Sequence, residues 1–161
     1  MVQRVDAVIR EPRLTDAETI AALHVTTWRE TYGHLLPDDF FTGELLDRRR
    51  RMWTRILTDS RPEHVVRVAE AGGELIGFAM SGISDEGIPQ LYMLYVLAAQ
   101  HGAGIGQRLF DGVLPPGPAV LWVAKENPRA IAFYRRNGFA FDGAEQSDSG
   151  TAGIVEARMV R

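Results

Sequence analysis

The chain has 161 residues, 45% of them hydrophobic and 24% charged, which is the balance of a globular protein rather than a disordered one. A formal net charge of −3 gives no reason to expect nucleic acid as a partner, and the absence of cysteine excludes disulfides, thiolate metal ligands and a cysteine nucleophile. We also expect no metal. No segment approaches the roughly 20 apolar residues of a membrane-spanning helix and no signal peptide is recognisable, so we expect a cytoplasmic protein without a membrane partner.

The first part of the chain predicts one strand and two helices. A short strand is expected around residues 5–10. The segment Thr15-Asp16-Ala17-Glu18 has the form of a capping box, so we expect Thr15 to cap a helix that continues to about Tyr32. After a loop with Pro37, a second helix is expected over residues 44–57.

Four consecutive arginines, residues 48–51, form the one local concentration of charge. On a helix, four consecutive side chains fan out around the axis. We therefore interpret the run as part of a solvated face, with a substrate-facing role as the alternative.

From residue 65 onward the hydrophobic period changes to that of strands. Residues 65–70 and 75–81, joined by Gly72-Gly73, are typical of a β-hairpin with a tight turn. Residues 91–97 form a third run of strand type. A glycine-rich segment, residues 100–106, follows it at once.

The last part of the chain alternates helices and strands. A short helix from Ile105 ends before the Pro-Pro-Gly-Pro run at residues 115–118, and an apolar strand follows at 119–123. Asn127-Pro128 predicts the start of another helix, with Asn127 as N-cap. Two strands, around residues 139–144 and 154–160, complete the chain.

The resulting order, β-α-α-β-β-β-α-β-α-β-β, predicts an α/β (α+β) fold. We expect one domain over residues 1–161, with a mixed, mostly antiparallel sheet flanked by helices. The strand–helix–strand unit over residues 91–123 is expected to form one parallel β-α-β crossover.

The glycine-rich segment, Gln-His-Gly-Ala-Gly-Ile-Gly, lies between a predicted strand and a predicted helix. Glycines allow close backbone approach to an anion, and the free amides of a helix start bind it, so the segment predicts a phosphate site, with simple packing as the alternative. Gly106 is followed by Gln107-Arg108 instead of the Lys-Ser/Thr of a Walker A loop. The third glycine of a dinucleotide fingerprint is also missing, so both nucleotide interpretations are poor.

The segment and the residues around it resemble the acetyl-CoA motif of the GNAT superfamily of N-acetyltransferases. The residues that carry the resemblance are Leu94-Tyr95-Val96, His101-Gly102-Ala103-Gly104-Ile105-Gly106, Leu121-Trp122-Val123, Asn127, Ala130, Phe133-Tyr134 and Asn137-Gly138-Phe139. The element order agrees with that superfamily over essentially the whole chain.

The resemblance implies acetyl-CoA as co-substrate and assigns roles to the matching positions. Backbone groups of Leu94 and Val96, on either side of Tyr95, would pair with the pantetheine arm as an added strand, and one of their amides would polarise the thioester carbonyl. The amides of residues 102–107 would hold the pyrophosphate. Asn127 would hydrogen-bond the cofactor arm, with a plain helix cap as the alternative.

The implied activity is transfer of an acetyl group to a primary amine. Tyr134 matches the position where the family places a general acid that protonates the departing thiolate, whereas a core tyrosine is the alternative. Because no cysteine is present to form an acyl-enzyme, direct attack in a ternary complex is expected. The rival interpretation is a non-catalytic acyl-CoA-binding or sensing module on the same fold.

Two positions depart from the family pattern. His101 stands where the motif begins with Arg or Gln, and Gln100 is a competing register. Gln90 stands where many relatives carry a glutamate that acts as general base, and a neutral amide cannot accept a proton. The candidate bases are then Glu30, His34, Glu74, a water chain, or none if the acceptor arrives already deprotonated.

The acceptor side is expected at the first two helices, their connecting loop and the face of the central strand. Trp28, Tyr32 and Tyr92 are candidates for lining an apolar or aromatic pocket there. Helical spacing favours a core position for Trp28, and Tyr32, near the helix end, has the better claim to the pocket. The acceptor itself stays open between a small-molecule amine and a protein or peptide amine. The oligomeric state is also open, with a homodimer as one option.

Overall fold

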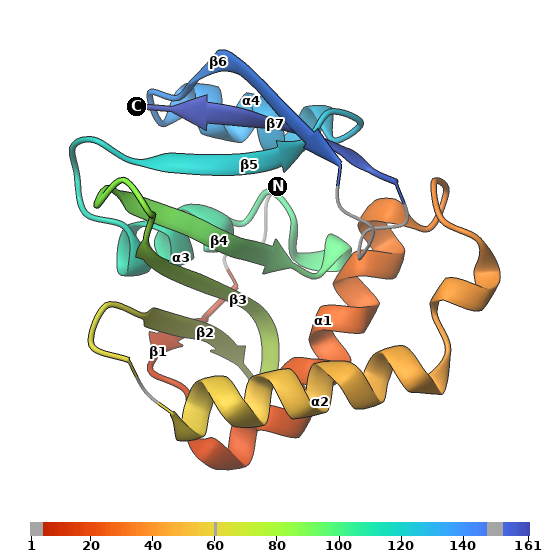
Figure 1. The fold of residues 1–161 in the computed structure, drawn as a ribbon. Coiled ribbons are helices and arrows are strands. Elements are labelled where there is room, and N and C mark those ends of the chain that lie inside the picture. Colours follow the sequence, from red (N-terminus) through yellow and green to blue (C-terminus); the bar gives the residue numbers. More distant parts are fainter. Residues whose placement is uncertain (1–4, 60, 148–152) are drawn as a thin grey trace.

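A computed structural model describes residues 5–59, 61–147 and 153–161 (Figure 1). The elements, in chain order, are β1 (Val8–Arg10), η1 (Leu14–Asp16), α1 (Ala17–Tyr32), η2 (Asp38–Phe40), α2 (Gly43–Thr58), β2 (Val65–Ala71), β3 (Glu74–Ile83), β4 (Pro89–Val96), η3 (Ala98–Gln100), α3 (Ile105–Val113), β5 (Val120–Ala124), α4 (Pro128–Arg136), β6 (Ala140–Ser147) and β7 (Val155–Val160). The type and order of the main helices and strands agree with the sequence-based prediction.

The described strands form one seven-stranded sheet in the order β1-β2-β3-β4-β5-β7-β6. Neighbouring strands are antiparallel except β4 and β5, which are parallel and joined through α3. The prediction of a mixed, mostly antiparallel sheet with one parallel crossover is therefore confirmed.

The start of α1 differs from the sequence-based prediction. Thr15 lies inside the short 3-10 turn η1, and α1 begins only at Ala17, so the predicted cap at Thr15 is wrong. The physical reason is that Asp16 organises this turn. Its carboxylate accepts a hydrogen bond from the Arg13 amide at 2.7 Å and forms an ion pair with Arg10 of β1 at 2.9 Å.

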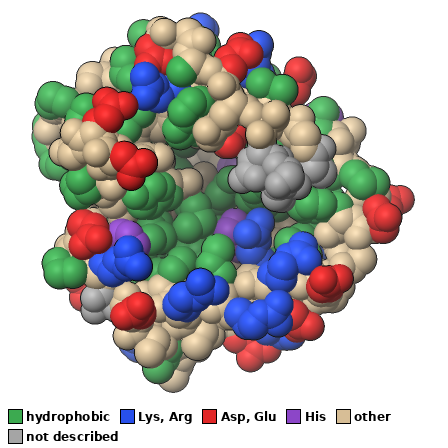
Figure 2. Space-filling view, in the orientation of Figure 1, with side chains coloured by type: hydrophobic (Ala, Val, Ile, Leu, Met, Phe, Trp, Pro, Cys, Tyr) green, Lys and Arg blue, Asp and Glu red, His purple; other side chains and the backbone are tan. Residues whose placement is uncertain are grey.

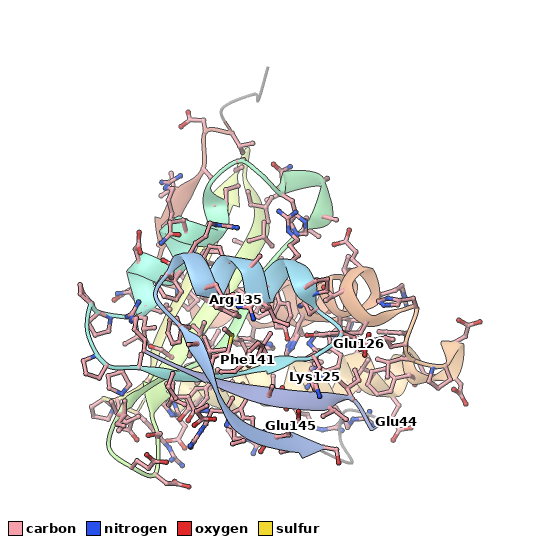
Figure 3. All side chains as sticks on the ribbon, turned by 90° about the horizontal axis from the view of Figure 1, so that it is seen from above. Glu44, Lys125, Glu126, Arg135, Phe141 and Glu145 are labelled. Carbon is pink, nitrogen blue, oxygen red and sulfur yellow. The ribbon has the colours of Figure 1, made fainter. Side chains whose placement is uncertain are left out.

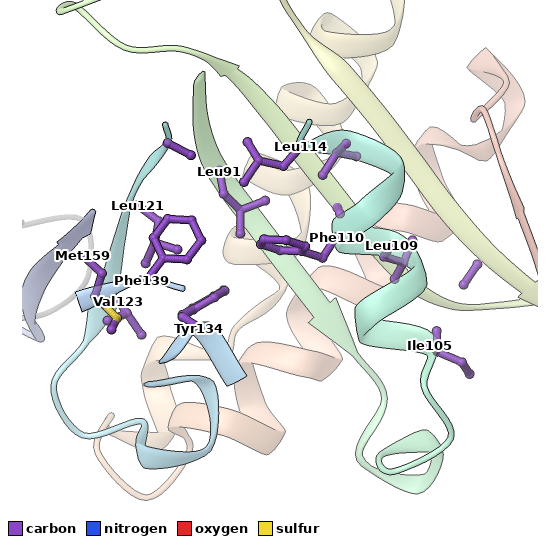
Figure 4. Packing of buried hydrophobic residues seen from close by; sticks show 14 of the residues in the cluster. Leu91, Ile105, Leu109, Phe110, Leu114, Leu121, Val123, Tyr134, Phe139 and Met159 are labelled. Carbon is purple, nitrogen blue, oxygen red and sulfur yellow. The ribbon is translucent and has the colours of Figure 1, made fainter. Parts of the chain in front are cut away.

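Helices cover both faces of the sheet (Figure 1). On one face, α1 and α2 pack on β2 and β3 around Trp53, Phe78 and Val68, which are all fully buried. On the other face, α3 and α4 enclose a second cluster. Figure 4 shows Phe110 of α3 in that cluster, with Tyr134 of α4 nearby.

The sheet opens between its two parallel strands. Pairing of β4 with β5 is limited to Gln90 with Val120 and Leu91 with Leu121. Tyr92 follows at once as an extra residue, because Ser81 of β3 pairs with Leu91 whereas Met80 pairs with Met93. Such a bulge bends its strand and ends regular pairing. Beyond it, β4 stays with β3 and β5 stays with β7, and the two strands diverge (Figure 1).

Candidate active site

A cavity of about 820 Å³ lies where β4 and β5 diverge. Its walls come from both strands, the turn before α3, the start of α4 and the end of α1. A space of this size is within the range of small-molecule and cofactor pockets. The parted strands therefore create the main candidate site in the described part of the chain.

The edge of β4 presents backbone groups to this cavity. Leu97 donates to the Ile76 carbonyl of β3 at 2.9 Å, so these two residues form a hydrogen-bonded pair. Hydrogen-bonded and non-hydrogen-bonded pairs alternate along an antiparallel ladder. Leu94 and Val96 are consequently in the non-hydrogen-bonded positions, and their amides and carbonyls point away from β3, towards the gap.

His101 uses one of these groups. Its Nε2 lies 2.9 Å from the Val96 carbonyl oxygen, so the imidazole ties the glycine turn to the end of β4. The carbonyl of Val96 is thereby occupied, whereas its amide and both backbone groups of Leu94 have no β5 partner. The His101 side chain thus positions the glycine turn through a contact with the protein's own backbone.

The glycine turn ends in a helix start with free amides. Gly102 and Gly104 have φ angles of 84° and 81°, a backbone conformation that residues other than glycine rarely adopt. The first intrahelical bond runs from Arg108 N to the Gly104 carbonyl at 3.2 Å, which leaves the amides of residues 105–107 without an intrahelical acceptor. Ala103 packs partly buried beneath the turn. This backbone geometry suits a bound anion.

The side chain of Gln107 connects α3 to the end of α4. Its Nε2 donates to Asn137 Oδ1 at 2.9 Å, and Asn137 Nδ2 donates back to Gln107 Oε1 at 3.1 Å. The residue therefore offers a ligand its backbone amide, while its side chain fixes two walls of the site relative to each other.

Two predicted residues lie on the α4 side of the cavity. Asn127 caps α4 through Oδ1, which accepts from the Ala130 amide at 3.2 Å, and it also borders the cavity, so the cap and a ligand contact are compatible. Tyr134 borders the cavity with 8% of its surface exposed. Burial, followed by the influence of Tyr32, raises the pKa of Tyr134, which keeps its hydroxyl protonated at neutral pH.

An aromatic wall stands on the α1 side. The ring centres of Trp28 and Tyr32 are 4.7 Å apart, and those of Trp28 and Tyr95 are 6.5 Å apart. Tyr32 and Tyr95 border the cavity, whereas Trp28 stands behind them. Burial raises the pKa of Tyr32, and its hydrogen-bonding interactions with Asn127 and Tyr95 act in the opposite direction.

Tyr92 contributes to the cavity differently from the expectation of a pocket-lining aromatic. As the bulge residue of β4 it borders the cavity, but 41% of its surface is exposed. Its hydroxyl donates to the Ile83 carbonyl at 3.2 Å, and its ring lies against Gly82. The side chain is therefore directed along the sheet towards the end of β3.

The candidate bases are distributed unequally around the site. Glu30 borders the cavity, but its Oε1 accepts from the Ala98 amide at 3.1 Å and so holds η3. His34 borders the cavity and is exposed. Glu74 begins β3 at the hairpin turn and does not border the cavity. Gln90 lies at the closed end of the gap, where β4 and β5 still pair.

Two cavity carboxylates were not among the candidate bases predicted from the sequence. Glu126 lies in the turn between β5 and α4 (Figure 3). Glu156 lies on β7 opposite Ala124, and Gln146 Nε2 donates to its Oε1 at 3.3 Å. The alternation of β7, with Ala157 and Met159 buried, indicates that Glu156 faces the other way. Only the strand order reveals that this face borders the gap.

The sheet opens between two parallel strands, and the start of a helix lies beside the opening. The model of the acetyltransferase (GNAT) family matches residues 18–139, and the chain belongs to this family. It is therefore an acetyltransferase. The reaction of the family is acetyl transfer from acetyl-CoA to an amine acceptor.

Individual relatives agree with this assignment. The chain is 32% identical over 146 residues to the probable N-acetyltransferase Rv2775 of Mycobacterium tuberculosis, covering 84% of this chain and 80% of that protein. It is 31% identical over 138 residues to the uncharacterized N-acetyltransferase YuaI of Bacillus subtilis, covering 79% and 76%.

A solved structure shares the fold. The PaiA N-acetyltransferase of Thermoplasma acidophilum, in complex with coenzyme A, superposes with a TM-score of 0.77 at 20% identity, covering 97% of this chain and 98% of that one. At this identity the likeness shows a common fold. Among the described residues, no helix combines the length and apolar character needed to span a bilayer.

Proposed function

We propose that this chain transfers the acetyl group of acetyl-CoA to a primary amine by direct attack in a ternary complex, with the co-substrate held between β4 and β5. The observation that carries the proposal is the pair of parted strand edges next to the free amides of α3. The acetyl thioester supplies an activated carbonyl carbon to this site.

The backbone of the site fits the two ends of the co-substrate. The outward groups of Leu94 and the amide of Val96 match an extended amide-bearing arm added as a strand. The amides of residues 105–107, below the turn opened by Gly102 and Gly104, match a pyrophosphate. Asn127 also borders the cavity, with Oδ1 engaged in the helix cap and its side chain in a hydrogen-bonding interaction with Tyr32, and we assign it a contact with the arm.

The chemical step needs a polarised carbonyl and a departing thiolate. An amide of β4, from Leu94 or Val96, stabilises the negative charge that develops on the carbonyl oxygen. The amine nitrogen bonds to the acetyl carbon as the carbon–sulfur bond breaks. Tyr134, whose hydroxyl is protonated at neutral pH, donates that proton to the sulfur and is reprotonated from solvent before the next cycle.

The amine must also lose a proton. Glu156 borders the cavity on the face opposite the glycine turn and lies near enough to Tyr32 to raise its pKa. We therefore assign Glu156 as the group that receives the proton, directly or through water.

The test is thiol release from acetyl-CoA with a panel of primary amines, for the natural chain and Tyr134→Phe. We expect kcat to fall on the order of 100-fold in the variant, with acetyl-CoA binding retained, because the ring stays and only the proton donor is lost. Unchanged turnover would remove Tyr134 from the mechanism. Tight acetyl-CoA binding without thiol release for any amine would support the binding-module alternative.

A further inference from the structure

Arg49 of α2 lies in an unusual environment for a surface arginine. Its guanidinium carbon is 5.4 Å from the centre of the Trp28 ring, and the side chain is half-buried. Burial lowers the pKa of this guanidinium. The same charge contributes, after burial, to lowering the pKa of His24. The Arg49 side chain therefore turns inward, towards α1 and β4, unlike the side chains on the outer face of α2.

No counter-ion accompanies this charge within the described residues. The arginines on either side are paired: Arg48 with Glu44 at 3.3 Å, and Arg50 with both Asp47 and Glu18 at 3.0 Å. The groups that act on Arg49 are the Trp28 and Tyr95 rings, the like charge of Arg48, and His24, which burial keeps neutral. Withdrawing a cation from water without an anion costs free energy. A ligand anion would offset that cost.

The location connects Arg49 to the acceptor side of the site. Trp28, which the guanidinium covers, touches Tyr32 and Tyr95, and both of these border the cavity. Figure 2 shows this face hollowed, with hydrophobic side chains inside and Lys and Arg side chains gathered along the lower edge, where α2 runs. Glu156 borders the cavity on the same side of the sheet, beyond Tyr32.

We propose that Arg49 binds a carboxylate of the acceptor, so that the substrate class is amines that also carry a carboxylate. This inference rests on the proposed acetyl transfer. The planar guanidinium binds a carboxylate through two parallel hydrogen bonds, while the Tyr32 and Tyr95 rings, which border the cavity, contact the apolar body of the acceptor. The amine then extends into the cavity, towards Tyr134 and Glu156.

The geometry also sets the length of the acceptor. The centre of the Trp28 ring is 5.4 Å from the guanidinium carbon and 4.7 Å from the centre of the Tyr32 ring. Tyr134 borders the cavity, whereas Arg49 and Trp28 do not, so an amine and a carboxylate on one carbon, as in an α-amino acid reacting at its α-amine, would not reach both places. The favoured acceptors have several bonds between the two groups, as in a long ω-amino acid or the side-chain amine of lysine.

The experiment compares matched acceptors that differ only in charge and length. A series of ω-amino acids of increasing chain length is assayed beside the corresponding carboxamides, by thiol release from acetyl-CoA. For the longer members we expect kcat/KM of the acid to exceed that of the amide by roughly 10- to 100-fold, the worth of a hydrogen-bonded charge pair. Short members should show no such preference.

Variants of α2 then locate the effect. Arg49→Gln should abolish the preference for acids while leaving the amides within a few-fold of the natural chain, and Arg49→Lys should retain part of the preference. Arg51→Gln is the matched control, because Arg51 is exposed on the same helix, and both acceptor types should react unchanged. Unfolding temperatures of the variants check that each one is folded.

The outcomes separate this inference from the proposed function. Thiol release without a preference for acids, or an Arg49→Gln effect equal for acid and amide, overturns the carboxylate site and leaves acetyl transfer standing. If no amine releases thiol, the proposed acetyl transfer is overturned. Calorimetric titration of the CoA-saturated protein with a long ω-amino acid then tests the carboxylate site at Arg49 separately. Saturable binding lost in Arg49→Gln supports the site, and equal binding overturns it.

Discussion

Some side chains of this protein both stabilise the fold and position part of the candidate site. His101 illustrates this, because its imidazole holds the Val96 carbonyl at 2.9 Å and so fixes the glycine turn against β4. A neutral imidazole can make this contact without the fixed charge of an arginine. The departure from the family pattern at this position is therefore compatible with an ordered turn.

We expect His101→Ala to raise KM for acetyl-CoA several-fold with little change in kcat, since the turn loses its tie to β4 while the reacting groups stay in place. His101→Gln, which keeps a hydrogen-bonding side chain, should recover most of the affinity. Steady-state kinetics with varied acetyl-CoA check both variants. A fall in kcat at unchanged KM would contradict the positioning role.

His24 provides a pH prediction at the residue scale. It is 3% exposed, Trp53 Nε1 donates to its Nδ1 at 3.1 Å, and burial lowers its pKa to about 3. Between this value and the ordinary pKa of about 6.5, the unfolded chain binds a proton that the folded chain does not. Stability should therefore fall as the pH falls through this window, by about 1.4 kcal/mol per pH unit.

The prediction is checked by urea unfolding of the natural chain and His24→Gln at pH 7 and pH 5. From pH 7 to pH 5 the natural chain should lose about 2 kcal/mol more than the variant, because His34, His64 and His101 are common to both and cancel. Identical losses would show that His24 takes up its proton in the folded state.

At the scale of elements, two predicted helix starts show how far cap residues can be recognised from the sequence. Asn127 with Pro128 indicated the start of α4, and the structure has this cap. Thr15 is also of a residue type that is favoured as a helix cap. Asp16 organises the turn instead, because Arg10, from another element, binds its carboxylate. Local signals determine a helix start only where no distant side chain competes for it.

The glycine turn gives a prediction at this scale. Gly104→Ala places a side chain at a φ of 81°, which costs about 1–2 kcal/mol, and the strain should tilt the amides of residues 105–107. We expect lower stability and a higher KM for acetyl-CoA. Gly43→Ala, at the start of α2 with nothing within 4 Å of the new methyl, is the control and should leave both unchanged. Calorimetric titration of CoA and thermal unfolding measure the two effects.

Register is the property of the elements that the sequence does not reveal. The run over residues 91–97 predicted β4, but the bulge at Tyr92 follows from pairing with β3, which only the folded sheet displays. Tyr92 still borders the cavity, but the bulge directs its side chain along the sheet, where its hydroxyl donates to the Ile83 carbonyl. Likewise, Glu156 joins the site because β7 lies between β5 and β6, an order that no local pattern encodes.

For the whole molecule, the opened sheet means that one half is weakly connected to the other. Strands β1–β4 and the group β5, β7, β6 share only two strand-paired residue positions, Gln90 with Val120 and Leu91 with Leu121, among the described residues. The buried cluster around Leu109, Leu121 and Met159 spans both halves and carries the remaining connection. A ligand bound in the gap would join the halves along their free edges.

We therefore expect CoA to stabilise the entire fold and to protect specific amides from hydrogen exchange. At a free concentration of about 100 times Kd, the free energy of unfolding should rise by about 2.7 kcal/mol. Beyond this uniform gain, the amides of Leu94 and Val96 should slow most, because they point into the gap, whereas Tyr95 already donates towards β3. Exchange measured by NMR resolves the three residues. Equal slowing of Leu94, Tyr95 and Val96 would contradict pairing of the co-substrate with the free edge of β4, because only alternate amides face that edge.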